Sequence, residues 1–395
     1  MGSLAIEGGP PVRKAMLPYG RQTVDEADIE AVVGVLRSDW LTTGPRVAEF
    51  EQAFARTVGA RHAVVVSSGT AALHAAAYAA GLKSGNEAIV PPMTFAASAN
   101  CVVYLGADVI FADVRSDTLN LDPACVSAGL TPRTRAIVTV DYTGQPSDLD
   151  ELMALARQHD LTVIEDAAHS LGATYHDRPV GALAHLTIFS LHPVKHVTTG
   201  EGGVITTDDP DLDRRLRRFR NHGITSDHRQ REVAGSWFYE MVDLGYNYRI
   251  TDIQCALGLS QLEKLPAWLK RRRQIAAHYT AELANLSELE LPTVLPDREP
   301  AWHLYVIRLN LDRLTADRAE VFRALRAENI GVNVHYIPVP WHPFYQDRGY
   351  VKGQWPRAES AYERMMSLPI FPGMSDADVE DVIVAVRKVI AHYRR

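Results

Sequence analysis

Short runs of apolar and β-branched residues alternate with polar or helical segments through the first half of the sequence. A segment such as residues 148–159 is typical of the helices expected between the runs. Parallel strands need such crossover segments, and strands buried on both faces are nearly continuous in apolar residues. The pattern predicts an α/β domain with a mostly parallel sheet. The expected strands are residues 62–66, 87–90, 108–112, 136–141, 162–165, 186–190 and 203–206.

Helices are expected before the first strand and directly after it. Thr23-Val-Asp-Glu26 has the form of a capping box, which predicts a helix from about residue 24. A second helix is expected over residues 47–58. Ser67-Ser-Gly-Thr70 then joins the first strand to a helix that starts with Ala-Ala-Leu-His-Ala. The result is a strand, a turn and a helix.

The second half of the chain has a different order of elements. A helix over residues 254–265 is expected to end near Pro266, because proline removes a backbone donor, and a basic helix is expected around residues 270–273. The elements beyond it predict a small α+β domain, so we divide the chain into a large domain, residues 1–265, and a small C-terminal domain, residues 266–395. The later elements are strands at 302–309 and 331–336 and helices at 316–328 and 376–393.

Composition and charge exclude several classes of protein. The 395 residues are 46% hydrophobic and 23% charged, which is ordinary for a chain with a large core, and the net charge of -7 gives no basic field for nucleic acid. Cys101, Cys125 and Cys255 lie far apart, so neither a disulfide framework nor a metal site is expected. No export signal or membrane-spanning run is found, and a cytoplasmic protein is predicted.

The lysine in Phe189-Ser-Leu-His-Pro-Val-Lys195-His-Val-Thr-Thr-Gly-Glu-Gly-Gly203 is the strongest chemical signal. It follows an expected strand and precedes glycines that allow a ligand to approach the backbone. Partial burial and a nearby cationic ring would lower its pKa and leave the free amine that forms imines. If Lys195 is considered alone, a solvated surface position is the more common alternative.

An acid is expected at the carboxyl end of another strand, in Thr162-Val-Ile-Glu-Asp166-Ala-Ala-His169. Ligands of open α/β sheets bind at these strand ends. A carboxylate there can pair with the protonated pyridine nitrogen of pyridoxal phosphate (PLP). Strand alternation turns Glu165 to the opposite face, so Asp166 is the candidate. The alternative is that Asp166 caps the following helix.

Two further segments supply candidate cofactor contacts. Gly69 and Thr70 lie at an expected helix N-terminus, which suits a phosphate, and Ser190 can add a hydroxyl. An ordinary helix cap is the alternative for this turn. Phe95, in Pro92-Met-Thr-Phe95, is a candidate to stack on the pyridine ring, with a core position as the alternative.

Taken in their order along the chain, these motifs resemble those of the DegT/DnrJ/EryC1/StrS family of sugar aminotransferases. The resemblance runs from Leu17 to the last helix and includes Gly245-Tyr-Asn247-Tyr-Arg249 and Asn333-Val-His335-Tyr336. It implies the fold of PLP-dependent transferases of fold type I, similar to aspartate aminotransferase. That fold has a large mixed-sheet domain and a smaller α+β C-terminal domain.

The resemblance also implies residue roles. Lys195 would carry PLP as a Schiff base and Asp166 would face the pyridine nitrogen. His169 would lie near the ring hydroxyl, although many relatives have glutamine at its position and an aromatic residue at that of Leu191. Asn247 would reach the PLP phosphate of a neighbouring subunit, which implies a homodimer with shared active sites. The phosphate of the same subunit would be bound by Gly69, Thr70 and Ser190.

For the substrate, the resemblance assigns Thr42 and Gly44 to the border of the pocket and His335 and Tyr336 to the nucleotide sugar. A core position is the alternative for His335. The intact Lys195 argues against the dehydratase branch of the family, in which histidine replaces it.

Within the family, the lysine segment and Val-His-Tyr-Ile-Pro-Val resemble the C4 aminotransferases of pseudaminic acid synthesis. This likeness implies transamination of a UDP-linked 4-keto-6-deoxy-N-acetylhexosamine, with L-glutamate as amino donor. The alternatives are a GDP- or dTDP-linked 4-keto or 3-keto hexose as substrate, or a scaffold or regulator without turnover.

Overall fold

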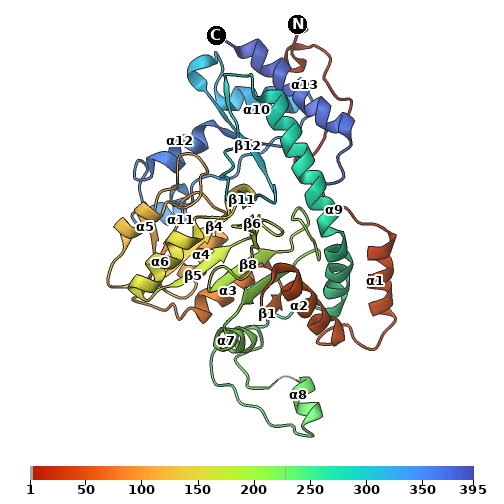
Figure 1. Cartoon of the computed structure of the whole chain (residues 1–395), viewed down its shortest axis with the longest axis vertical. Coiled ribbons are helices and arrows are strands. Elements are labelled where there is room, and N and C mark those ends of the chain that lie inside the picture. The colour runs from red at the N-terminus through yellow and green to blue at the C-terminus, as the bar shows by residue number, and fades with distance from the viewer. Residues whose placement is uncertain (1–2, 227) are drawn as a thin grey trace.

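The central sheet of the molecule lies among helices, and a second group of elements that includes both chain ends packs above it (Figure 1). This computed structural model describes residues 3–226 and 228–395. Seven strands of the described chain form the sheet in the order β1-β9-β8-β5-β4-β2-β3. They are β1 (His62–Val66), β2 (Glu87–Val90), β3 (Asp108–Phe111), β4 (Thr134–Val140), β5 (Thr162–Asp166), β8 (Leu186–Ser190) and β9 (Gly203–Thr207).

The strand directions agree with the sequence-based expectation of a mostly parallel sheet. Strands β3, β2, β4, β5 and β8 run parallel, whereas β9 is antiparallel to both of its neighbours, β8 and β1. All four residues of β2 are buried, as expected for a strand covered by helices on both faces.

Alanines bring helix α3 (Gly69–Ala79) close to the sheet. Ala72, Ala75, Ala76 and Ala79 are fully buried in the cluster that includes the sheet residues. Small side chains allow this close packing, and it places the N-terminus of α3 beside the ends of β8 and β9. The other helices around the sheet are α4 (Ala97–Val103), α5 (Pro123–Gly129), α6 (Leu149–His159) and α7 (Pro210–Arg220).

The first long helix begins later than its expected capping box. Helix α1 (Glu26–Leu36) is capped by Asp25, whose Oδ1 accepts from the Asp28 N–H, while the Asp28 carboxylate accepts from the Asp25 N–H. The prediction that Thr23 and Glu26 form the box is therefore wrong by two residues, because Asp25 is also a strong capping residue. Helix α2 (Pro45–Val58) forms as expected, with proline in its first turn.

Helix α9 (Asp252–Leu283) is continuous over 32 residues and contains Pro266 in its interior. The expected helix end at Pro266 is therefore wrong. Proline in a helix costs about 3 kcal/mol. Leu262, Leu265 and Leu269 are buried around it, and burying such side chains stabilises by about 1.5–3 kcal/mol each. The division into residues 1–265 and 266–395 stays a prediction.

A three-stranded antiparallel sheet forms the second group of elements with helices α10 and α13. The expected strand at 331–336 is absent from this described region. The Gly331 N–H donates to the Leu17 carbonyl and Asn333 bridges to Ser367, so the segment has two different partners and forms no ladder. The elements are β10 (Leu289–Glu290), β12 (Tyr305–Leu309), β13 (Met365–Leu368), α10 (Arg318–Ala327), α11 (Pro343–Gln346), α12 (Pro356–Arg364) and α13 (Asp376–Tyr393).

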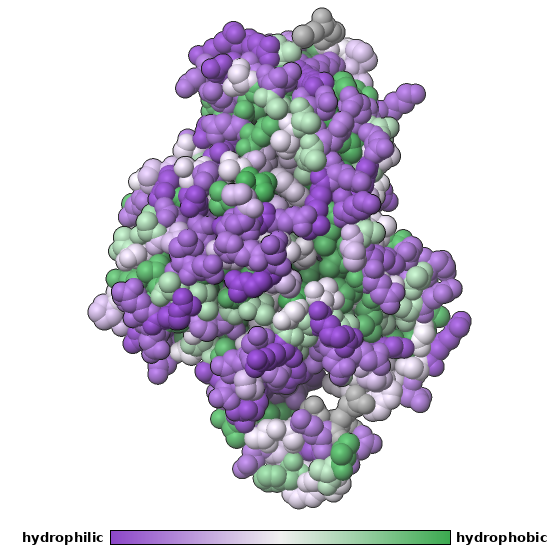
Figure 2. Space-filling view, in the orientation of Figure 1, coloured by the Kyte–Doolittle hydropathy of each residue, from purple (hydrophilic) through white to green (hydrophobic). Residues whose placement is uncertain are grey.

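Residues 222–226 and 228–247, which we call the arm, project from the body and contain α8 (His228–Val233) (Figure 1). The arm carries exposed apolar side chains, with Trp237 85% and Leu244 68% exposed. Figure 2 shows apolar patches on this projection. Within the described ranges, no helix has the length and apolar character needed to span a bilayer.

Candidate active site

Lys195 lies in the loop that connects β8 to β9. Its Nζ is 3.5 Å from Nε2 of His303. Burial lowers the pKa of Lys195 to about 8; the carboxylate of Asp166 opposes this shift and the charge of Arg272 adds to it. About a tenth of this amine is therefore neutral at pH 7, far more than for an ordinary lysine, and the neutral form is the nucleophile.

Asp166 ends β5 and lies within electrostatic range of Lys195. Ser98 Oγ donates a 2.6 Å hydrogen bond to its Oδ2, and the Ala168 N–H donates to Oδ1 at 3.2 Å. Burial raises the pKa of Asp166, whereas these two donors and Lys195 lower it. Glu165 makes a separate contact, with Thr187 Oγ1. The two neighbouring acids therefore have different partners, in line with strand alternation.

The N-terminus of α3 meets Ser190 at the end of β8. The Ser68 hydroxyl accepts from the Ala71 N–H, while the N–H groups of Gly69 and Thr70 have no acceptor within the helix. A Cβ on Gly69 would lie 3.0 Å from the Ser190 Cβ, so a larger residue would crowd this junction. The structure thus brings the three predicted phosphate contacts, Gly69, Thr70 and Ser190, to one helix N-terminus.

His169 lies among aromatic side chains near Lys195. Its Nε2 is 3.1 Å from the Tyr336 hydroxyl, and its ring centroid is 4.4 Å from that of His303. Its Nδ1 is buried and has no hydrogen-bond partner in the described part of the chain. Phe95 is 60% exposed and its ring centroid is 6.0 Å from that of Tyr336, so Phe95 is not a core residue.

His335 is buried, and both of its ring nitrogens contact protein groups. Nδ1 is 2.8 Å from Ser367 Oγ and Nε2 is 3.2 Å from Asn333 Nδ2. Burial lowers the pKa of His335 to about 4. These contacts agree with the core alternative, and its role toward the sugar stays a prediction.

Thr42 and Gly44 lie near the start of α9, whereas Asn247 lies at the base of the arm. Thr42 pairs with Thr251, and the Gly44 N–H donates to Asp252 Oδ2 at 2.7 Å. Asn247 is exposed at the base of the arm, where it pairs with Asn221. Within one described chain, these three residues have no recorded contact with Lys195.

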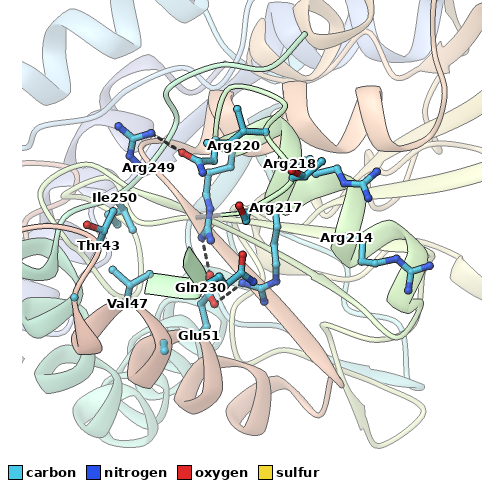
Figure 3. Close-up of a pocket in the computed structure, with 16 residues that line it drawn as sticks. Thr43, Val47, Glu51, Arg214, Arg217, Arg218, Arg220, Gln230, Arg249 and Ile250 are labelled. Atoms are coloured by element: carbon cyan, nitrogen blue, oxygen red, sulfur yellow. Dashed lines mark hydrogen bonds and ion pairs between the residues drawn. The ribbon is translucent and has the colours of Figure 1, made fainter. Parts of the chain in front are cut away.

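A cavity of about 450 Å³ with a basic lining lies between α2, α7 and the arm (Figure 3). Gly44 is on its wall. Glu51 binds Arg217 at 2.8 Å and Arg220 at 2.6 Å, and Arg249 donates to Asn221 at 2.7 Å. Five arginines and one carboxylate line the wall. Asp211 and Asp213 pair with two of these arginines beside the cavity, and an excess of positive charge remains. The arginines are Arg214, Arg217, Arg218, Arg220 and Arg249.

Sequence reasoning missed Ser98, Arg272 and His303. Ser98 follows Thr94 by four residues, and the two hydroxyls are 2.7 Å apart, so helical spacing was an available signal. Arg272 belongs to a basic run that has the pattern of a solvated helix. His303 precedes β12, about 100 residues after Lys195, and no local pattern indicates their contact.

The family profile described as the DegT/DnrJ/EryC1/StrS aminotransferase family matches residues 22–387. The chain belongs to this family. A curated relative, the spore coat polysaccharide biosynthesis protein SpsC of Bacillus subtilis, is 43% identical over 381 residues. These are 96% of this chain and 98% of SpsC.

Several solved structures have the same fold as this chain. Helicobacter pylori PseC, an aminotransferase involved in the biosynthesis of pseudaminic acid, is 30% identical with a TM-score of 0.89, over 96% of this chain and 100% of PseC. The PLP form of the putative sugar aminotransferase Spr1654 from Streptococcus pneumoniae is 30% identical with a TM-score of 0.89, over 95% and 99%. DesV of S. venezuelae is 36% identical with a TM-score of 0.85, over 92% and 94%.

Membership in the DegT/DnrJ/EryC1/StrS family confirms four sequence-based predictions: the family, the fold class, the dependence on PLP and the activity of a sugar aminotransferase. The roles of individual residues are a separate question.

Proposed function

We propose that this protein transfers an amino group from L-glutamate to C4 of a UDP-linked 4-keto-6-deoxy-N-acetylhexosamine, with PLP bound to Lys195. The observation that carries the proposal is the placement of Lys195 and Asp166. Asp166 ends β5, Lys195 follows the neighbouring parallel strand β8, and each shifts the pKa of the other. An amine and an acid are thus available to a single ligand at one edge of the sheet.

The surrounding groups fit PLP. Gly69, Thr70 and Ser190 suit its phosphate, and the unpartnered Nδ1 of His169 suits the ring hydroxyl. The exposed ring of Phe95 suits a face of the pyridine. When bound, PLP supplies an aldehyde that combines with amines and a cationic ring that stabilises negative charge on the adjoining carbon.

Two residues of the chain act directly in the proposed reaction. Asp166 is the proposed partner of the cationic ring: burial raises its pKa, and the Ser98 hydrogen bond and the charge of Lys195 oppose that rise in favour of the ionised form. Lys195 Nζ moves a proton between the substrate carbon and the cofactor carbon. A pKa of about 8 suits a group that both accepts and donates this proton.

The basic cavity and the arm complete the proposal. A nucleotide sugar carries a diphosphate, which favours a basic lining such as that around Arg249. Asn247 is exposed at the base of the arm, and apolar side chains of the arm are exposed to solvent in the described chain. We therefore propose a homodimer in which this region of one subunit completes the active site of the other, and a cytoplasmic location.

A panel of substrates tests the proposal. The purified protein is incubated with PLP, glutamate and UDP-, GDP- or dTDP-linked 4-keto sugars or 3-keto hexoses, and 2-oxoglutarate is measured. We expect formation of 2-oxoglutarate with the UDP-linked N-acetylated 4-keto sugar and none with the Lys195→Ala variant. Equal or greater turnover of a dTDP- or GDP-linked hexose would overturn the substrate assignment.

An aminotransferase for another nucleotide sugar is the second candidate. The identity to DesV is 36% and that to PseC is 30%. For this reason the GDP- and dTDP-linked sugars are kept in the panel as alternative substrates.

A further inference from the structure

His303 contacts the Lys195 amine but has no role in the proposed function. Its side chain is buried, and its Nε2 lies 3.5 Å from Lys195 Nζ. Among the described residues, this nitrogen is the polar atom recorded within hydrogen-bond distance of that amine. A buried ammonium needs acceptors, because it has three donors and loses its water.

Hydrogen bonds to the backbone carbonyls of residues 301–303 hold His303 in place. Arg272 donates hydrogen bonds to the backbone carbonyls of Trp302, at 3.0 Å, and of His303, at 3.4 Å. His196 Nε2 lies 3.0 Å from the Ala301 carbonyl, which only an N–H on that nitrogen satisfies. These contacts define the backbone position from which the His303 ring reaches Lys195.

Charge explains why an imidazole suits this position. Asp166 on β5 and Arg272 on α9 are the charged groups that act on Lys195, and the imidazoles around it are His169, His196, His303 and His335. Burial lowers the pKa of each of these imidazoles, so they are neutral at neutral pH. A carboxylate in place of His303 would hold the lysine as an ammonium and raise its pKa.

We propose that His303 is a positioning residue whose Nε2 accepts a hydrogen bond from Lys195 Nζ, stabilising the ammonium without adding negative charge. The ammonium proton stays on Nζ, and no bond other than this hydrogen bond forms or breaks. The neutral ring then carries its own proton on Nδ1, which is buried and has no partner among the described residues. His303 thereby holds the amine in one place in both of its protonation states. The importance of this contact for turnover rests on the proposed function, whereas the contact itself does not.

The test measures the pKa of Lys195 without turnover. Cofactor-free, full-length protein is labelled with trace acetic anhydride over a range of pH, and mass spectrometry of peptides gives the pKa of each lysine. The other six lysines of the sequence serve as internal references. His303→Met removes the acceptor, and we expect the pKa of Lys195 to fall by about one unit, because a hydrogen bond to a charged group is lost.

Two variants separate this contact from a general disturbance of the cluster. His303→Gln retains an acceptor, and we expect the pKa of Lys195 to return to within a few tenths of a unit of the parent value. His335→Gln changes another imidazole of the cluster, which contacts Ser367 and Asn333 rather than Nζ, and we expect no shift. An unchanged pKa in His303→Met, or an equal shift in His335→Gln, would overturn the proposal.

If His303→Met does not fold, His303→Ala replaces it, with free imidazole added to fill the space. We expect the pKa of Lys195 to be lowered in His303→Ala and restored by imidazole; the absence of either change would overturn the proposal. The proposed function fails separately, if borohydride reduction of the PLP-bound enzyme labels a lysine other than Lys195.

Discussion

Ser98 Oγ donates a 2.6 Å hydrogen bond to Asp166 Oδ2, which joins helix α4 to the end of strand β5. This bond opposes the rise in the Asp166 pKa that burial causes. The acid proposed to hold the cofactor ring cationic therefore depends on a hydroxyl from another element.

Ser98→Ala should raise the pKa of Asp166 further, since burial then has less opposition. On acidification Asp166 would then become protonated at a higher pH, so the acid limb of the kcat/KM profile should move to higher pH by about one unit. The control is Ser170→Ala, which removes a hydrogen bond of the same length to Asp141. An identical profile for Ser98→Ala and the parent would contradict this prediction.

Asp166→Asn should reduce kcat by at least about 100-fold while the fold is retained, because a neutral amide no longer holds the pyridine nitrogen protonated. Steady-state kinetics and circular dichroism measure the two properties. Glu165→Gln is the matched control: Glu165 is the neighbouring buried acid, and its raised pKa already favours the neutral form. Near-normal turnover by Asp166→Asn would refute the pairing.

Lys195→Ala should abolish the covalent attachment of PLP. After borohydride treatment, mass spectrometry should find the cofactor mass on the peptide of Lys195 in the parent protein and on no peptide of the variant. Cofactor fixed to another lysine in the variant would show that the lysine assignment is wrong.

Gly69→Ala should weaken PLP binding by about tenfold, because its Cβ would lie 3.0 Å from the Ser190 Cβ and crowd the phosphate turn. Fluorescence titration of the cofactor-free protein measures the affinity. Gly34→Ala in α1 is the control, since a Cβ there meets no atom within 4 Å, and it should leave affinity unchanged. Equal affinities for Gly69→Ala and the parent would show that the turn accommodates the added methyl group and would contradict the prediction.

The protein should lose stability as the pH falls from about 6.5 toward 4. Burial lowers the pKa of His74 and of His335 to about 4, so below pH 6.5 the unfolded chain binds protons that the folded chain does not. Each of these histidines contributes a loss of up to about 1.4 kcal/mol per pH unit in this window. Urea unfolding at several pH values checks this, and His74→Phe should flatten the dependence, whereas His159→Gln at an exposed position should not.

Local pattern was sufficient for most of the large sheet. The strands ending at Val66, Val90 and Ser190 were predicted at their observed bounds, because apolar runs between turn residues are a local signal. Local pattern failed at Pro266, where buried leucines on both sides keep one helix intact, and at residues 331–336, where the backbone pairs with two separate partners.

The sequence by itself determined the strands of the large sheet, the lysine, acid and phosphate motifs, and the family to which they belong. These depend on residues close together in the chain. The tertiary structure decided that Ser98 supports Asp166, that His303 contacts Lys195, and that Gly44 borders an arginine-lined cavity. Such contacts join residues that are tens to hundreds of positions apart, and packing of whole elements brings them together.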